Sequence, residues 1–324
     1  MACGRGRSTP RSRVCPGVAA VSDAWRVAVL SKSAIVPSTA LLLAAIRRSG
    51  HEPLLLEILR GVIALRDGEE LVSFAGVAAD ELRADRCIII PRVGSFLPEL
   101  GLALLGALER RGAVTPNTSE AIRCARNKRT TIERLSAARL PTPATVYLQD
   151  FEQIDAAIRI VGGPPVIVKP VVGSQGRGVE LLESWSAARA GIHAVLSRNQ
   201  QILIQEYVAQ ERPSDLRLFV IGGRMVAAMR RRAAPGRVQA NLHRGGSAER
   251  CEPTAETRDL ACRAARVAGL EIAGVDIIES ARGPLVLEVN PAPGLEGISA
   301  ASGIDVAGEI VAFVLRSTEG VRSQ

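Results

Sequence analysis

Residues 274–294, with the sequence GVDIIESARGPLVLEVNPAPG, constrain this chain more than any other segment. Runs of Val, Ile and Leu on both sides of the short turn ARGP predict two adjacent buried strands. Asp276, Glu288 and Asn290 interrupt these runs, and we expect their side chains to project from the hairpin into one pocket. Mg²⁺ accepts such oxygen ligands and usually shares them with nucleotide phosphates. A nucleotide-dependent enzyme is therefore the first hypothesis.

Composition limits the alternatives. The chain has 324 residues, 47% of them hydrophobic, which is enough for two domains with real cores. Its longest apolar runs, residues 40–46 and 102–108, are far shorter than the roughly 20 residues that cross a bilayer, so we expect no membrane span. The six cysteines form no CxxC pair and no metal-binding spacing with the three histidines. Scattered thiols indicate a reducing compartment, and we expect a cytoplasmic protein without zinc.

The net charge of +8 is unevenly distributed. Residues 1–22 carry four arginines and no acidic residue, so half of the excess lies there. We interpret this segment as a disordered basic extension, or as the result of a start codon placed too early, in preference to a transit peptide. Aromatic residues make up only 3% of the chain, which argues against a nucleic-acid stacking surface. A basic pocket for an acidic or phosphorylated ligand fits the charge better.

Residues 23–115 alternate between strand-like and helix-like segments. The strand WRVAVLS precedes the helix STALLLAAIRRSG, and HEPLLLEIL is followed by a polar stretch to Gly68. The strand RCIIIPRVG then leads into the helix ELGLALLGALERRG. This order predicts a parallel α/β domain.

Residues 116–318 show a different pattern. One or two helices, with Ser119 as the N-cap and Pro141 after the end, connect the two parts. Short strands with Gly-rich turns follow, and a single long helix, AETRDLACRAARVAGL, interrupts them. We expect an α+β domain with a mainly antiparallel sheet.

A glycine-rich loop offers a candidate phosphate site. In VIVKPVVGSQGRGVELL, three glycines lie between two strands, Ser174 and Gln175 lie at the tip, and Lys169 lies on the incoming strand. Glycines let backbone N–H groups approach phosphate oxygens. The order G-x-x-G-x-G is not that of a dinucleotide-binding loop, and no P-loop motif is present. A simple hairpin turn is an equally good interpretation of this segment alone.

Two further segments carry polar residues of interest. In QEYVAQERPSDLRLF, residues 205–208 end an apolar strand and would suit a linker whose backbone pairs with an adenine edge, and Asp215 could meet ribose hydroxyls. The segment MRRRAAPGRVQANLHRGG places three arginines before Asn241 and His243, where cations would hold a phosphate or a carboxylate. Ordinary exposed surface is the competing interpretation of both.

Taken together, these passages resemble the ATP-grasp ligases, specifically the RimK-type branch, which attaches glutamate to a ribosomal small-subunit protein or acts on related carboxylates. The likeness covers about residues 119–315 through VIVKPVVGSQGRGVELL, ILIQEYV with Asp215-Leu-Arg217, NLHRGG, and EVNPAPGLEGI. It implies an ATP-grasp domain of α+β type preceded by a parallel α/β pre-ATP-grasp domain. The activity implied is that of an ADP-forming carboxylate-amine ligase.

The resemblance implies roles for individual residues. Residues implied for nucleotide binding are Lys128, Lys169, Ser174, Gln175, Gly176, Glu206, Tyr207, Asp215, Gln239, Ala240 and Asn241. Those implied for magnesium are Asp276, Glu288 and Asn290, with Glu288 bridging two ions and manganese as a possible substitute. Those implied at the reacting centre are Arg217, Arg231 and Asn241.

The chemistry that follows is amide formation through an acylphosphate, which requires metal and cations more than a strong base. The implied substrates are ATP, L-glutamate and a carboxylate acceptor, either a ribosomal protein C-terminus or a cofactor tail such as a pterin or deazaflavin. Pro291 after the magnesium asparagine, and Pro170 after Lys169, depart from the family pattern. Amino-acid biosynthesis with the same fold, a nucleotide-dependent kinase and a non-catalytic nucleotide-binding regulator are the alternatives. We expect no direct nucleic-acid or membrane partner, and a homo-oligomer is possible.

Overall fold

The computed structural model describes residues 25–77, 82, 86–173, 177–210, 213–234 and 245–321, with side chains up to residue 316. The basic extension predicted at residues 1–22 lies outside this range. Six of the residues implied for the site also lie outside it: Ser174, Gln175, Gly176, Gln239, Ala240 and Asn241.

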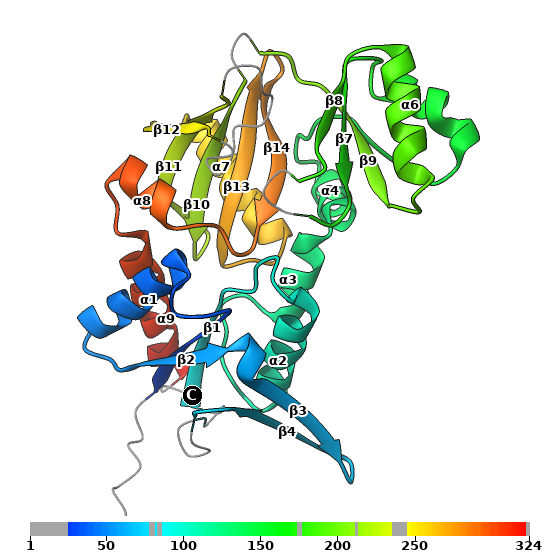
Figure 1. The fold of residues 1–324 in the computed structure, drawn as a ribbon. Helices are drawn as coiled ribbons and strands as arrows, with labels where there is room; N and C mark the ends of the chain where they lie inside the picture. Colours follow the sequence, from blue (N-terminus) through cyan, green and yellow to red (C-terminus); the bar gives the residue numbers. More distant parts are fainter. Residues whose placement is uncertain are drawn as a thin grey trace, which may run out of the picture.

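The N-terminal part is built on a small parallel sheet (Figure 1). Its strand order is β2-β1-β5, and β1 pairs in parallel with both neighbours. The strands are β1 (Arg26–Ser31), β2 (Pro53–Glu57) and β5 (Cys87–Pro91), and the helices are α1 (Pro37–Arg48) and α2 (Pro98–Arg110). The central strand is almost wholly buried because each face is covered by a helix. This arrangement confirms the predicted parallel α/β fold.

A β-hairpin occupies the region after β2, where the sequence predicted only a polar stretch to Gly68. A short 3-10 helix (Ile58–Arg60) leads into β3 (Gly61–Arg66) and β4 (Glu69–Phe74), which pair antiparallel and extend away from the sheet (Figure 1). Asp67 and Gly68 form the turn with φ of 53° and 81°, a backbone conformation typical of two-residue hairpin loops. The prediction was wrong because Asp-Gly marks a hairpin turn as well as a loop.

Two helices connect the N-terminal part to the rest: α3 (Ser119–Arg126) and α4 (Lys128–Ala137). The cap of α3 is Thr118, whose Oγ1 accepts a hydrogen bond from the Ala121 amide at 3.1 Å, so the prediction of Ser119 was wrong by one residue. Asn127 caps α4 through the Thr130 amide. Lys128 therefore lies at the first turn of a capped helix, at a fixed position.

The first of two antiparallel sheets has the order β6-β9-β7-β8. Its strands are β6 (Thr145–Leu148), β7 (Val166–Pro170), β8 (Glu180–Leu182) and β9 (Ile202–Glu206). A 3-10 turn (Phe151–Gln153) and two helices, α5 (Ile154–Ile160) and α6 (Trp185–Leu196), pack on it around Ile158 and Ile192. The prediction of a single long helix was therefore wrong. Periodic apolar residues at 188, 192 and 196, after the capping Ser184, carried the signal for α6.

The second antiparallel sheet has the order β12-β11-β10-β13-β14. Its strands are β10 (Ser214–Ile221), β11 (Arg224–Arg232), β12 (Ser247–Arg250), β13 (Ile272–Ser280) and β14 (Gly283–Asn290). Helix α7 (Ala255–Val267) covers one face and contacts Leu216 and Leu218. Because side chains alternate along a strand, Asp215 and Arg217 point to the opposite face. The predicted antiparallel character is confirmed.

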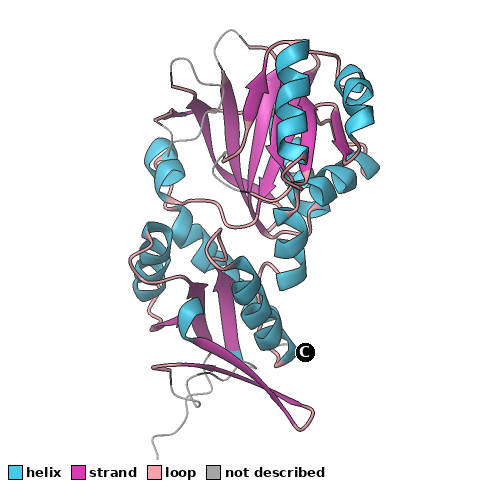
Figure 2. Ribbon diagram, turned by 45° about the vertical axis from the view of Figure 1, so that its right-hand side comes forward, coloured by secondary structure: helices cyan, strands magenta, loops and turns pink. Residues whose placement is uncertain are grey.

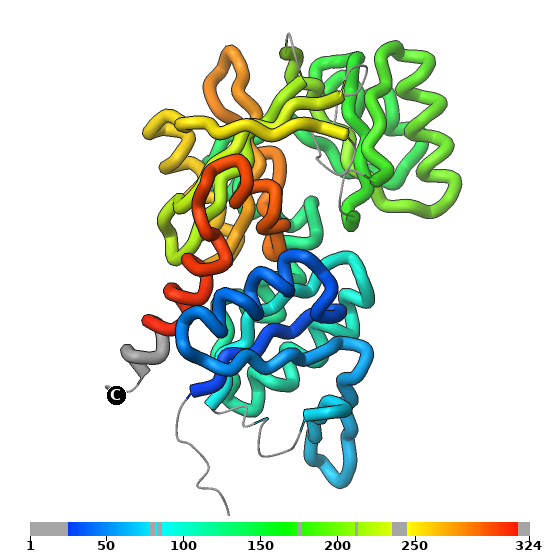
Figure 3. Tube along the Cα trace, turned by 60° about the vertical axis from the view of Figure 1, so that its left-hand side comes forward, coloured from blue at the N-terminus to red at the C-terminus, as the bar shows by residue number. Residues whose placement is uncertain are grey.

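The C-terminal helices join the two parts of the molecule. Helix α8 (Glu296–Ser302) and helix α9 (Val306–Val321) share one hydrophobic core with α1 and with Phe219 of β10. Figure 3 shows α9 (red) running beside α1 (blue). No single helix in the described ranges is long and apolar enough to span a membrane; α8 and α9 pass that test only as a pair bent by 106°.

Candidate active site

A cavity of about 180 Å³ opens between the two antiparallel sheets. One wall comes from β7, β9 and the segment after β9, and the other from β10, β11, β13 and β14. The lining residues are Lys128, Ile167, Lys169, Gly173, Arg177, Val179, Gln205, Glu206, Tyr207, Val208, Gln210, Pro213, Ser214, Asp215, Arg231, Asp276, Ile278, Leu287 and Glu288. The lining combines apolar side chains with a cluster of charged groups around Asp276, which suits a ligand with a flat apolar part and an anionic part.

A buried ion network organises the charged end. Arg217 Nε and Nη2 donate to the two Asp276 carboxylate oxygens at 2.7 and 2.6 Å. Arg231 Nη2 lies 2.9 Å from Asp276 Oδ2, and the same guanidinium donates twice to Asp215 at 2.6 and 2.8 Å. All four side chains come from neighbouring strands of the second sheet: the register pairs Asp215 with Arg231 and Arg217 with Asp276.

This network sets the protonation states of Asp276 and Arg231. Burial would raise the pKa of Asp276, but Arg217 and Arg231 outweigh it and lower that pKa. Burial works against the charge of Arg231, yet Asp276 and Asp215 raise its pKa above the usual value. Asp276 is therefore a carboxylate and Arg231 a guanidinium cation at neutral pH.

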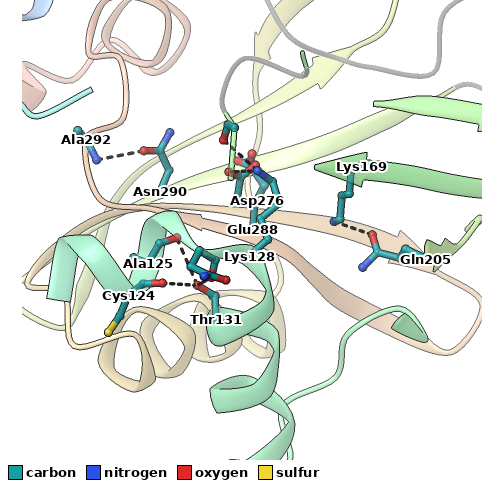
Figure 4. A network of polar contacts seen from close by, with 12 residues as sticks. Cys124, Ala125, Lys128, Thr131, Lys169, Gln205, Asp276, Glu288, Asn290 and Ala292 are labelled. Atoms are coloured by element: carbon teal, nitrogen blue, oxygen red, sulfur yellow. Dashed lines mark hydrogen bonds and ion pairs between the residues drawn. The ribbon is translucent and has the colours of Figure 1, made fainter. Parts of the chain in front are cut away.

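Two lysines face the carboxylates. Lys128 Nζ donates to the Gly173 carbonyl at 2.9 Å and lies 4.0 Å from Glu288 Oε1. Lys169 Nζ donates to Gln205 Oε1 at 2.8 Å, across the cavity from the hairpin (Figure 4). Burial lowers the pKa of Lys169 to about 8, against an opposing effect of Glu288 and a supporting one of Lys128. Lys169 thus remains mostly protonated at pH 7 but carries a large desolvation penalty.

The three oxygen ligands predicted from the hairpin do not all line the cavity. Asp276 and Glu288 are register partners and both line it. Asn290 does not; its Oδ1 accepts a hydrogen bond from the Ala292 amide at 3.0 Å, toward which it points in Figure 4. The place predicted for Asn290 beside the other two ligands therefore stays a prediction. Arg217 also lies behind Asp276 and off the cavity wall.

The donor set suits a magnesium ion that arrives with a phosphate ligand. Within the described part of the chain, no group of three or more His, Cys, Asp and Glu side chains could hold a metal ion alone. Mg²⁺ prefers six oxygens and completes its coordination with water and substrate phosphates. Asp276 and Glu288 supply part of such a shell, and the nearby Lys128 and Lys169 would contact the same phosphates.

Glu206 and Tyr207 also line the cavity, and Glu206 pairs with Val166, three residues along β7 from Lys169. Glu206 accepts from the Ala144 amide at 3.1 Å and from Arg282 Nη2 at 2.6 and 2.7 Å. Arg282 belongs to the turn between β13 and β14, so this ion pair joins the two sheets across the cavity. Glu206 and Tyr207 belong to the segment predicted to pair with an adenine edge. The carboxylate of Glu206 is already paired with the guanidinium of Arg282.

The sequence interpretation assigned no role to the side chains of two residues that shape the site. Gln205 orients Lys169 and in turn donates to Thr145 Oγ1 at 2.8 Å. Asn117, 1% exposed, donates to the Ile272 and Pro291 carbonyls and accepts from the Glu271 and Ile272 amides. A single polar residue inside the apolar run ILIQE was the available signal for Gln205, whereas Asn117 gave none.

Comparison with known proteins assigns the chain to a protein family. Residues 125–314 match the RimK-like ATP-grasp domain, and residues 25–122 match the RimK pre-ATP-grasp domain. The chain belongs to the RimK-like ATP-grasp family. It is 41% identical to a probable alpha-L-glutamate ligase of Thioalkalivibrio sulfidiphilus (strain HL-EbGR7), over 92% of this chain and 98% of the relative. A probable alpha-L-glutamate ligase of Aeromonas salmonicida (strain A449) is 39% identical over 89% and 96%.

Solved structures confirm the ATP-grasp fold. The ATP-grasp ligase PsnB complexed with a minimal precursor superposes with a TM-score of 0.68 at 21% identity, covering 90% of this chain and 99% of that one. The D-alanine–D-alanine ligase of Bacillus anthracis complexed with ATP gives 0.65 at 16%, covering 93% and 99%. This RimK-like protein is an ATP-dependent carboxylate-amine ligase, as predicted, and the alternatives of a kinase or a regulator are not favoured.

Proposed function

We propose that this ligase joins the amino group of L-glutamate to a carboxylate of a peptide or protein acceptor. The observation that carries the proposal is the arrangement of Lys128, Lys169 and Arg231 around the paired carboxylates Asp276 and Glu288. Such a cationic cleft is suited to bringing a phosphate and a carboxylate together. The full-length similarity to probable alpha-L-glutamate ligases supports glutamate as the amine. Because PsnB is solved with a precursor peptide, a peptide acceptor is the preferred class over a cofactor tail.

The proposed reaction has two steps. An acceptor carboxylate oxygen attacks the γ-phosphorus of ATP, the bond to the β–γ bridging oxygen breaks, and ADP leaves behind an acylphosphate. The glutamate amine then attacks the acyl carbon, phosphate departs, and the amine loses a proton to form the amide. In this scheme Lys128 and Lys169 hold ATP phosphates, and Glu206 and Tyr207 hold the adenine. Arg231, held between Asp215 and Asp276, stabilises charge on the transferred group.

Magnesium would neutralise phosphate charge and orient the nucleotide when bound. Asp276, Glu288 and Asn290 are the proposed ligands, and two ions are the proposed number. Asn290 would have to exchange its hydrogen bond with the Ala292 amide for this role. Ser174, Gln175, Gly176, Gln239, Ala240 and Asn241 retain their predicted nucleotide or catalytic roles as part of the proposal. We also propose that the chain divides into two domains, residues 23–115 and residues 116–318.

The test is a reconstituted ligation. The protein is incubated with ATP, Mg²⁺, labelled L-glutamate and peptides that have free C-terminal carboxylates, including the C-terminus of a ribosomal small-subunit protein. A peptide mass increase of one glutamate residue, with ADP and phosphate released in equal amounts, is expected. C-terminally amidated peptides serve as the substrate control and should remain unchanged.

Matched variants connect the activity to the site. Glu288→Gln removes a cavity carboxylate and should lower ligation by at least about 100-fold, as expected for loss of a charge-stabilising group. Glu279→Gln removes an exposed carboxylate near the far end of β13, paired with Arg230, and should leave ligation unchanged. ADP release without any amine requirement would support a kinase instead and would contradict the proposal.

A further inference from the structure

A second basic region lies at the carboxyl ends of the parallel strands of the N-terminal sheet. These ends point toward the larger body of the molecule, which contains the cavity (Figure 2). Strand β1 lies between β2 and β5, so the connections after β1 and β5 lead to opposite sides of the sheet. Ligands of open parallel sheets bind in the crevice at such a switch point.

Three cationic side chains surround the segment that follows β5. Arg92 is part of this segment and donates from Nη2 to the Pro293 carbonyl at 2.6 Å. Arg126 Nη1 donates to the Gly94 carbonyl at 2.7 Å, and Lys32 Nζ lies 4.5 Å from the centre of the Phe96 ring. Of the carboxylates in the described ranges, none forms an ion pair with any of these three cations.

The nearest acidic groups are already engaged. Glu296, which acts on Arg92 electrostatically, accepts from Ser38 Oγ at 3.0 Å and from the Leu295 amide at 2.9 Å. Burial lowers the pKa of Arg92 to about 10, so its charge is incompletely compensated by the protein. Glu99, which acts on Arg126, pairs with Arg123 at 2.9 Å.

An unsatisfied hydroxyl lies in the same region. Ser33 Oγ is the buried side-chain polar atom without a hydrogen-bond partner in the described part of the chain. It follows Lys32 directly, in the connection from β1 to α1. A buried hydroxyl without a partner costs free energy, and it donates readily to an anion that reaches it.

The region is also linked to both sides of the catalytic site. The Pro293 carbonyl that Arg92 contacts lies three residues after Asn290, and Arg126 lies two residues before Lys128. A ligand held here would therefore adjoin the segments that position the proposed magnesium and phosphate ligands.

We propose that Arg92, Arg126, Lys32 and Ser33 form a binding site for a substrate carboxylate that does not itself react. This inference rests on the proposed function, because a glutamate amine brings two such carboxylates and a peptide acceptor ending in glutamate brings one more. Arginine is the residue best suited to hold a carboxylate through paired hydrogen bonds. The site selects dicarboxylate substrates, whereas the cavity between the sheets binds the nucleotide.

The test compares substrates that differ by one carboxylate. Wild type, Arg92→Gln, Arg92→Lys and Arg126→Gln are assayed with glutamate against glutamine as the amine, and with acceptor peptides ending in glutamate against glutamine. In the wild type the substrate that carries the extra carboxylate should be preferred. Arg92→Gln should reduce that preference roughly 10- to 100-fold, the effect of losing a charge-assisted hydrogen bond, and Arg92→Lys should restore part of it. The substrate pair whose preference collapses identifies the source of the bound carboxylate.

Two further measurements distinguish failure of the proposed carboxylate site from failure of the proposed ligase function. Arg123→Gln removes an arginine of the same helix as Arg126 that is paired with Glu99, and it should change neither preference. Stabilisation of each variant by glutarate, followed as a shift in melting temperature, reports the site without catalysis. If wild-type protein is stabilised by glutarate but ligates no glutamate, the proposed function is wrong and the carboxylate site is still supported. Equal glutarate shifts in wild type, Arg92→Gln and Arg126→Gln, with unchanged preferences, would overturn the site.

Discussion

Lys169 should destabilise the ligand-free protein, because its charge is buried and no carboxylate of the described residues contacts it directly. Among those residues, the amide oxygen of Gln205 is the one hydrogen-bond acceptor of Nζ, and Lys169 is 7% exposed. Lowering the pKa from 10.5 to about 8 corresponds to a penalty of roughly 3 kcal/mol, at about 1.36 kcal/mol per pKa unit. Lys169→Met keeps an unbranched side chain and removes the charge. It leaves Gln205 Oε1 without its donor, which costs about 1 kcal/mol.

The net expectation is that Lys169→Met raises the free energy of unfolding by about 2 kcal/mol at pH 7. The gain has a defined pH dependence. Below the folded-state pKa of about 8, Lys169 is charged in both states and the penalty is fully present. As the pH rises toward the unfolded value of 10.5, the folded state has lost its proton and the penalty disappears. Wild type should therefore approach the variant in stability between those two pH values.

Urea unfolding of both proteins between pH 7 and pH 10, without nucleotide, measures this difference. Calorimetric titration with ATP and Mg²⁺ should show the opposite effect, a loss of affinity of roughly 10- to 100-fold in the variant. Lys128→Met is the control, since it breaks the bond to the Gly173 carbonyl and should reduce stability. A variant less stable than wild type at pH 7, or a difference that does not change with pH, would refute the reasoning.

Three shorter predictions concern the network around the cavity. Asn117→Ala removes four buried hydrogen bonds and should lower the free energy of unfolding by about 2–4 kcal/mol in urea titrations. Asp215→Asn weakens the hold on Arg231 and should lower kcat/KM about 10-fold in the ligation assay, whereas the exposed Asp259→Asn should not. Because guanidinium groups already engage both oxygens of Asp276, Mg²⁺ alone should shift the melting temperature little, and Mg²⁺ with ATP should shift it strongly.

The sequence predicted the elements whose patterns are local. The hairpin of β13 and β14 was predicted from apolar runs around a short turn, and Asp276, Glu288 and Asn290 were predicted to project from it into one pocket. The register pairs Asp276 with Glu288. The parallel sheet followed from alternating strands and helices. The β3–β4 hairpin was missed although β3 carries the apolar run VIAL, because the Asp-Gly pair after it was interpreted as part of a polar stretch and not as a hairpin turn. The roles predicted for the individual site residues remain predictions.

The long-range partners of charged residues could not be predicted. Asp215 was interpreted as a ribose contact, but its carboxylate is bound to Arg231, sixteen residues away along the chain. Arg217 and Asp276 are separated by fifty-nine residues and become neighbours only through the register of β10 and β13. Strand register depends on the whole sheet, so a motif gives the residue types of the site without giving their pairing.

The balance of charge explains why the cleft needs no strong base for its first step. Three carboxylates at the cavity are accompanied by four basic side chains: Asp215, Asp276 and Glu288 against Lys128, Lys169, Arg217 and Arg231. Two like charges 4 Å apart repel by about 4 kcal/mol at an effective dielectric constant of about 20, so an acceptor carboxylate approaches a phosphate only where cations offset that cost. Arg231 remains charged throughout the physiological pH range because Asp276 and Asp215 raise its pKa. Among these cations Lys169 has the lowered pKa, about 8, so loss of its proton should weaken nucleotide binding above that pH. Bound phosphate would raise the pKa of Lys169, and the bound nucleotide would thereby extend the pH range in which its own cationic site stays intact.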